Sequence, residues 1–146
     1  MAKQIMKRFG FILIIIFSFI SCKTYIIPIE SFTKQFKGVD TSNYKIVKTR
    51  GPFGEIVEYR ANPIDTIKCF DKKNNLVLLK NKPSLEIRFT RKNNKKTVFF
   101  FDKVFLQDTL IIGDMSRLIK LQKSIPIGSI KKIEIQDGHK NYKYVQ

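Results

Sequence analysis

The stretch LEIRFTRKNNKKTVFFF, residues 85–101, decides the fold class of this chain. In its first part the apolar residues Leu85, Ile87 and Phe89 alternate with charged ones, so they lie on one face of a strand. Strands with one apolar face are typical of an antiparallel sheet that is solvated on its other side. The polar RKNNK in the middle favours a hairpin loop, because Asn tolerates the left-handed backbone of tight turns. The stretch therefore predicts two antiparallel strands joined by a hairpin.

The second strand of this hairpin is apolar on both faces over residues 98–101. A run of that kind indicates a strand covered on both sides, so the sequence predicts a central position in the sheet. A second loop, DKKNN at residues 71–75, repeats the chemistry of RKNNK and predicts another hairpin.

Most of the remaining chain is also typical of short strands. Residues 116–123 favour either a turn of helix or another strand. The further strands are expected at residues 44–49, 55–61, 64–70, 76–80, 109–116, 123–128, 130–136 and 141–145. Because no helical pattern alternates with these strands, we expect a mainly β fold. It is a single antiparallel β-sandwich or a small, strongly bent barrel, formed by residues 29–146.

One short helix is expected at the N-terminal end of this domain, near residues 30–37. Phe32 and Phe36 are four residues apart and share one helical face, which favours packing against one end of the core. Ser31 is a suitable N-cap, and Gly38 is a suitable end.

The first residues have the features of a secretory signal. Lys3, Lys7 and Arg8 precede the apolar run FGFILIIIFSFIS, residues 9–21, and no acidic residue occurs before Cys22. The run is too short for a transmembrane helix, which needs about 20 apolar residues. It is also apolar all round, unlike the amphipathic helix of a globular core. We therefore expect residues 1–21 to be removed.

The end of this segment, Phe19-Ile20-Ser21-Cys22, resembles the lipobox of bacterial lipoproteins, with Phe19 where those proteins usually have Leu. The resemblance implies that the Cys22 sulfur receives a diacylglycerol and that the chain is cut before Cys22. The new amine would then receive a fatty acid such as palmitate. Residues 22–28 would form the lipidated cysteine and a tether. The mature chain, with its ending IPIGSIKKIEIQDGHKNYKYV at residues 125–145, is similar to small bacterial lipoproteins of unassigned activity.

These features predict a protein of the bacterial cell envelope that is held on a membrane by its lipid. Two or three acyl chains on one residue anchor a protein firmly, whereas a single myristoyl chain binds only marginally. Residues 23–28 contain none of the acidic residues that follow the cysteine in some lipoproteins of Gram-negative bacteria and direct their export to the cell surface, so we expect the protein to face the periplasm.

The chain is strongly basic, with a formal net charge of +16. Nucleic acid is the usual partner of basic proteins, but an exported lipoprotein meets little of it, so we expect no nucleic-acid binding. The Lys excess accompanies many Ile, Asn and Phe residues, which a genome rich in A and T would favour. The other explanation for the Lys excess is a functional one, namely attraction of the protein to anionic lipid. The candidate anion-binding residues surround two hairpin tips: Arg88, Arg91, Lys92, Lys95 and Lys96 at one, and Lys131, Lys132, Lys140 and Lys143 at the other.

The sequence predicts no catalytic residues, metal site or cofactor. His139 is the only histidine, and Cys69 is expected to be a small buried apolar residue, so the usual ligand and triad patterns are missing. We therefore expect a non-catalytic domain that binds an envelope protein or anionic lipid. Two alternatives stay open: a structural subunit of a larger envelope complex, and a hydrolase of envelope polymers that uses strand-end acids such as Asp102, Asp108 and Asp114.

Overall fold

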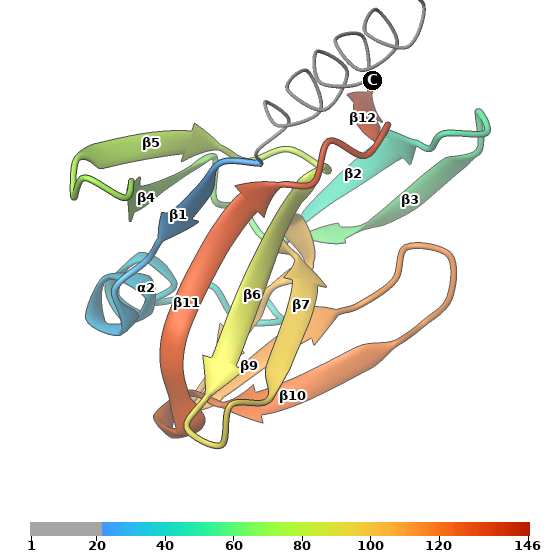
Figure 1. Ribbon diagram of the computed structural model, residues 1–146. Coiled ribbons are helices and arrows are strands. Elements are labelled where there is room, and N and C mark those ends of the chain that lie inside the picture. The colour runs from blue at the N-terminus through green and yellow to red at the C-terminus, as the bar shows by residue number, and fades with distance from the viewer. Residues whose placement is uncertain (1–21) are drawn as a thin grey trace, which may run out of the picture.

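The computed structural model describes residues 22–146, and Figure 1 shows them as antiparallel sheets with one α-helix. The expected signal segment lies outside the described residues. In chain order the elements are β1 (Thr24–Ile26), α2 (Ile29–Gln35), β2 (Lys45–Arg50), β3 (Ile56–Ala61), β4 (Thr66–Phe70), β5 (Leu76–Lys80), β6 (Leu85–Arg91), β7 (Lys96–Phe100), the 3-10 turn η1 (Phe101–Lys103), β8 (Phe105–Gln107), β9 (Leu110–Asp114), β10 (Gln122–Pro126), the 3-10 turn η2 (Ile127–Ser129), β11 (Ile130–Asp137) and β12 (Lys143–Val145).

The largest sheet has six strands in the order β5-β4-β1-β11-β6-β7. In β6 the side chains of Leu85, Ile87 and Phe89 are buried in the core, while Glu86 and Arg88 on the other face are half-buried. The predicted hairpin joins β6 to β7, and the predicted loop at residues 71–75 joins β4 to β5. Both hairpins confirm the antiparallel strand pairs that the sequence predicts.

Strand β7 is the last strand of this sheet, which contradicts the prediction that residues 98–101 form a central strand. The strand ends at Phe100, and Phe101 begins η1. Both faces of β7 are nevertheless covered, because Phe99 lies in the core and the Arg117 guanidinium lies 4.1 Å from the centroid of the Phe100 ring. Side chains from another segment, not a neighbouring strand, bury the second face.

Residues 22–28, expected to be a tether, contain strand β1, the third strand of the six-stranded sheet. Strand β1 pairs with β11 on one side, and Ile26 also pairs with Phe70 of β4 on the other. The next residue, Ile27, is only 1% exposed. The prediction of a tether over residues 22–28 is therefore wrong beyond Lys23. The three residues TYI are too few to show the alternation by which a strand is recognised in a sequence.

Helix α2 covers one end of the core with Phe32 and Phe36, which are fully buried, as predicted. Their rings stack with centroids 4.3 Å apart. The helix begins directly after Pro28, whose backbone φ of −57° suits the entry into a helix, so Ser31 lies within the helix and is not its cap. The chain leaves the turn that follows α2 through Gly38 with a φ of +79°, a conformation that glycine adopts without strain.

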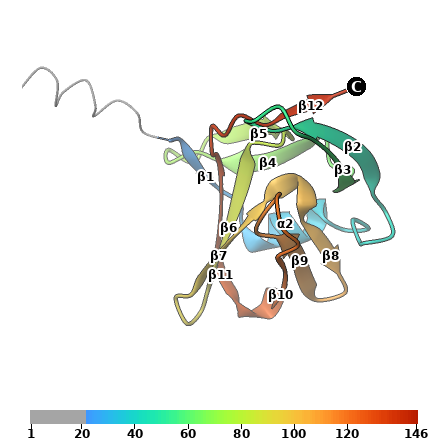
Figure 2. The same cartoon turned by 90° about the vertical axis from the view of Figure 1, so that its right-hand side faces the viewer.

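Strands β8, β9 and β10 form a second sheet, and β2, β3 and β12 form a third. Figure 2 shows β8 and β9 beside β6 and β7, below the hairpin of β2 and β3. None of the three sheets closes on itself within residues 22–146, so the arrangement is consistent with the predicted β-sandwich. Residues 116–121 form a loop between β9 and β10, neither of the two alternatives expected.

Over residues 22–146, no helix has the length and apolar content that crossing a membrane requires.

Candidate functional site

Cys22 is exposed and lies two residues before the first residue of β1. It therefore stands at the surface directly beside the six-stranded sheet. Its surroundings form a shallow groove between the start of β1 and the loop that joins β4 to β5. The residues that line this groove are Cys22, Lys23, Thr24, Tyr25, Asp71, Lys72, Lys73, Asn75 and Val77.

Asp71 holds the β4–β5 loop in shape through its carboxylate. This carboxylate accepts hydrogen bonds from the backbone N–H of Asn75 at 2.8 Å, from the Asn75 side-chain amide at 3.1 Å and from the backbone N–H of Lys73 at 2.9 Å. The Asn75 bonds, followed by that of Lys73, hold the pKa of the Asp71 carboxyl below its usual value. The exposed side chains of Lys72 and Lys73 form no ion pair with an acid in residues 22–146.

The predicted anion-binding residues gather only in part. Lys131 joins the hairpin tip of β6 and β7, because its ammonium group donates to the side-chain oxygen of Asn94 in that loop. Two of the set share one acid on the outer face of the sheet, where Glu134 lies 3.7 Å from Arg88 and 2.9 Å from Lys132. The residues that remain around the tip, here called the basic tip, are Arg91, Lys92, Lys95, Lys96 and Lys131.

The other two lysines of the second predicted group, Lys140 and Lys143, lie away from the basic tip, and Lys143 belongs to β12 of the third sheet. Strand β11 runs antiparallel to β6, so its first residue, Ile130, pairs with Arg91 at the basic tip, while its last residue pairs with the start of β6. Lys140 follows that far end and pairs with Glu86. Lys140 and Lys143 therefore do not join the basic tip in one anion-binding face.

A buried carboxylate, which the sequence indicated only as a strand-end acid, joins the sheets. Asp102 in η1 is 0% exposed. Its Oδ2 accepts hydrogen bonds from the hydroxyls of Tyr59 in β3 and Tyr144 in β12, the latter at 2.9 Å. Its Oδ1 accepts a bond of 2.7 Å from Nη2 of Arg117, in the loop between β9 and β10. The third sheet is thereby fixed to the turn that follows β7.

The backbone around Asp102 is held by a buried asparagine. The backbone N–H of Asn62 donates to the Asp102 carbonyl at 2.7 Å. The Asn62 side-chain amide donates to the carbonyls of Phe101 and Val104, at 2.7 and 3.1 Å. The Phe101 carbonyl also accepts the Val104 N–H at 3.1 Å, so Asn62 adds bonds that hold the buried backbone of this turn in place.

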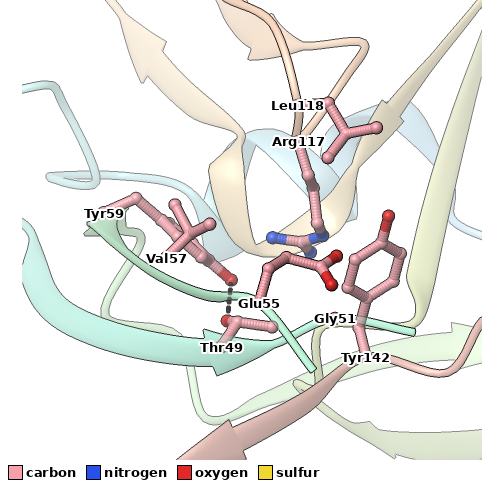
Figure 3. Close-up of a pocket in the computed structure, with 8 residues that line it drawn as sticks. All are labelled: Thr49, Gly51, Glu55, Val57, Tyr59, Arg117, Leu118 and Tyr142. Carbon is pink, nitrogen blue, oxygen red and sulfur yellow. Dashed lines mark hydrogen bonds between the residues drawn. The ribbon is translucent and has the colours of Figure 1, made fainter. Parts of the chain in front are cut away.

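Figure 3 shows the small pocket beside this cluster, in which Arg117 and Glu55 point toward one another. The Arg117 side chain is 5% exposed, and its Nη2 also donates to the Pro83 carbonyl at 2.7 Å. Its Nε and Nη1 have no hydrogen-bond partner among residues 22–146, but the guanidinium lies over the Phe100 ring, an arrangement that stabilises a cation. The free space is about 10 Å³, close to what one water needs and far below a ligand pocket of several hundred Å³.

The other acids expected at strand ends do not meet in a shared cleft. Asp108 lies exposed in the turn between β8 and β9 with a φ of 54°, and Asp114 pairs with Lys103 at 2.8 Å. His139 is exposed, and Cys69 is buried as predicted. Residues 22–146 hold no group of three or more His, Cys, Asp or Glu side chains that could bind a metal ion.

Comparisons of the chain with protein-family models, with curated proteins and with solved structures found no match.

Proposed function

We propose that the protein is a lipid-anchored lipoprotein of the bacterial cell envelope, periplasm-facing, whose β-domain acts by binding and not by catalysis. The observation that carries this proposal is the position of Cys22. This residue directly follows the signal-like segment and is exposed beside the sheet, so an acyl group on its sulfur meets no obstruction from the fold.

The binding role is supported by the distribution of charge. The basic tip presents four exposed lysines around one hairpin loop, and only Lys131 among them forms a hydrogen bond to a neighbouring side chain within residues 22–146. Clustered lysines attract anionic groups on a protein or a glycolipid. Asp102 is the most buried of the strand-end acids Asp102, Asp108 and Asp114. Its carboxylate already accepts hydrogen bonds from Arg117 and two tyrosines.

A second candidate function is that of a structural subunit within a larger envelope complex. Apolar side chains are exposed on the loop between β9 and β10, with Leu118 at 71% and Ile119 at 61%, and Phe53 in the β2–β3 hairpin is 91% exposed. Exposed apolar groups of this kind are typical of contact surfaces between proteins.

Metabolic labelling with an alkyne analogue of palmitate tests the proposed anchor. We expect the wild-type protein and a Cys69→Ala variant to incorporate the label, and a Cys22→Ala variant to incorporate none. Equal labelling of the Cys22→Ala variant, or no labelling of the wild type, would contradict the proposal.

Crosslinking in intact cells, followed by purification from detergent-solubilised envelopes, tests the binding role. The wild-type protein should recover a protein or lipid that a Lys92→Glu/Lys95→Glu variant recovers several-fold less. Recovery of nothing above the Cys22→Ala background would count against a binding function.

A further inference from the structure

We propose that the outer face of the β4–β5 hairpin, beside Cys22, lies on the surface of an anionic phospholipid bilayer. This inference rests on the proposed lipidation of Cys22 and adds the orientation in which the domain is held. We call this face the lipid-facing surface. Its strand residues are Ile26, Lys68, Phe70, Leu76, Leu78 and Lys80. Lys72 and Lys73 lie at its edge, in the tip of the hairpin.

The apolar residues of the lipid-facing surface share one face of the sheet. Ile26 pairs with Phe70, and Phe70 pairs with Leu76, and directly paired residues of antiparallel strands point to the same side. Leu78 follows Leu76 by two residues and therefore points the same way. Leu76 is 58% exposed, Leu78 60% and Ile26 42%. The fold leaves these side chains in solvent although the core takes up their neighbours Val77 and Leu79.

Lysines surround these apolar residues. Lys68 pairs with Leu78, and Lys80 follows Leu78 by two residues, so both point to the same face. Lys72 and Lys73 lie at the hairpin tip, in the groove that Cys22 lines. None of the four lysines forms an ion pair within residues 22–146. The negative surface potential of a membrane that contains anionic lipids attracts Lys and Arg side chains close to it.

The short link between Cys22 and the sheet fixes how near the lipid this surface must lie. Only Lys23 stands between Cys22 and β1, and an extended residue spans at most about 3.6 Å. If the acyl chains of Cys22 enter the hydrocarbon, the start of β1 and the adjoining β4–β5 tip are held at the level of the headgroups. The membrane that anchors Cys22 therefore lies next to the lipid-facing surface.

The basic tip lies on the opposite side of the molecule from β5 in both Figure 1 and Figure 2. Strand β6 has seven residues, which at about 3.4 Å per residue place its two ends roughly 20 Å apart. This separation exceeds a Debye length of about 10 Å, so the charges of the basic tip do not interact strongly with the anchoring membrane. The orientation thus directs the basic tip toward partners away from that membrane.

Fluorescence of labelled acylated protein tests this orientation. Leu78→Cys and the matched control Leu118→Cys, an exposed apolar residue in the loop between β9 and β10, are each labelled with a polarity-sensitive dye. They are then reconstituted in vesicles of phosphatidylglycerol and phosphatidylethanolamine. We expect a blue-shifted emission and several-fold stronger quenching by spin-labelled lipid at position 78 than at position 118. The Lys72→Glu/Lys73→Glu pair should weaken this quenching, whereas Lys92→Glu/Lys95→Glu should leave it unchanged.

The outcomes separate this inference from the proposed function. Acylated protein that floats with the vesicles while both dyes remain in water overturns the orientation alone. A disulfide that links two unlabelled Leu78→Cys molecules through their introduced thiols in the vesicles would assign the face to a second copy of the chain, and would also overturn it. Equal quenching in vesicles of phosphatidylcholine alone would remove the requirement for anionic lipid. Protein that carries no acyl group on Cys22 overturns the proposed function, and the orientation with it.

Discussion

The two cysteines outside the signal-like segment differ in exposure, and this difference decides their chemistry. Cys22 is exposed, whereas Cys69 is buried in β4, where its thiol contacts the Val77 carbonyl at 3.5 Å. Burial raises the pKa of the Cys69 thiol to about 11. The thiolate is the reactive form, so a buried thiol of high pKa reacts slowly.

We expect the native protein purified from membranes to show no thiol reactive toward iodoacetamide at pH 8, and one thiol after denaturation. The single thiol would be Cys69, because acylation occupies the Cys22 sulfur. Mass spectrometry after alkylation counts the modified sites. Rapid alkylation of Cys69 in the folded protein, or two thiols in the denatured protein, would contradict this expectation.

The ion pair of Asp102 and Arg117 is buried, with the two side chains 0% and 5% exposed. Arg117→Leu leaves the Asp102 carboxylate buried without its cation, which should lower the free energy of unfolding by about 3–5 kcal/mol. The matched control is Lys45→Ala, which removes a more exposed pair with Asp65 at 3.2 Å and should cost less than about 1 kcal/mol. Urea unfolding measures both, and equal losses would argue against a special role for Arg117.

The sequence predicted local features of residues better than distant contacts. Asn74 and Asn94 adopt the expected left-handed conformation, with φ of 63° and 66°. In contrast, the partners of Asp102 lie between 15 and 43 residues away, and only the packing of the sheets brings them together. Nothing in the neighbourhood of Asp102 or Arg117 in the sequence indicates that they meet.

At the level of elements, the sequence revealed strands that show alternation and missed those that do not. Strand β6 was predicted because its apolar and charged residues alternate from Leu85 to Phe89. Strand β1 has three residues and gave no such pattern. Strand β7 was also predicted, but as a central strand, because both of its faces are apolar. It lies at the edge of the sheet, and Arg117 covers the Phe100 side chain on its second face. The position of β7 within the sheet therefore depends on tertiary contacts, which the sequence of the strand alone does not reveal.

The packing of β9 against β7 depends on a glycine. A Cβ atom at Gly113 would lie 2.5 Å from the ring of Phe99, which is itself 1% exposed and cannot move aside freely. We expect Gly113→Ala to reduce the free energy of unfolding by about 1–3 kcal/mol through overpacking. Gly128→Ala is the matched control, since a Cβ there meets no atom within 4 Å. Thermal unfolding that shifts equally for the two variants would show that this contact is not tight.

For the whole molecule, alkaline pH should loosen the join between the third sheet and the rest of the fold. Burial, followed by the nearby Asp102 carboxylate, raises the pKa of both Tyr59 and Tyr144 above the usual value of a tyrosine. The folded state thus favours the protonated hydroxyls. Their contribution is complete below the unfolded pKa of about 10 and is lost as the pH rises above it, by up to about 1.4 kcal/mol per pH unit for Tyr59. Tyr144, which is 36% exposed, contributes less because solvent screens its interaction with Asp102.

Urea unfolding between pH 8 and pH 11.5 measures this loss. The double variant Tyr59→Phe/Tyr144→Phe should be less stable at pH 8 but should lose less stability as the pH rises. Tyr44→Phe, which removes a hydroxyl that does not bond to Asp102, is the matched control. A decline of stability in the double variant as steep as in the wild type would contradict the proposed origin.

The central claim for the whole molecule is that acyl chains on Cys22 hold this β-domain on a membrane. The mass of the intact protein extracted from native membranes tests it most directly. We predict a chain that begins at Cys22 and carries a diacylglycerol on its sulfur and a fatty acid on its amine. A chain that retains Met1 and has an unmodified Cys22 would contradict the claim.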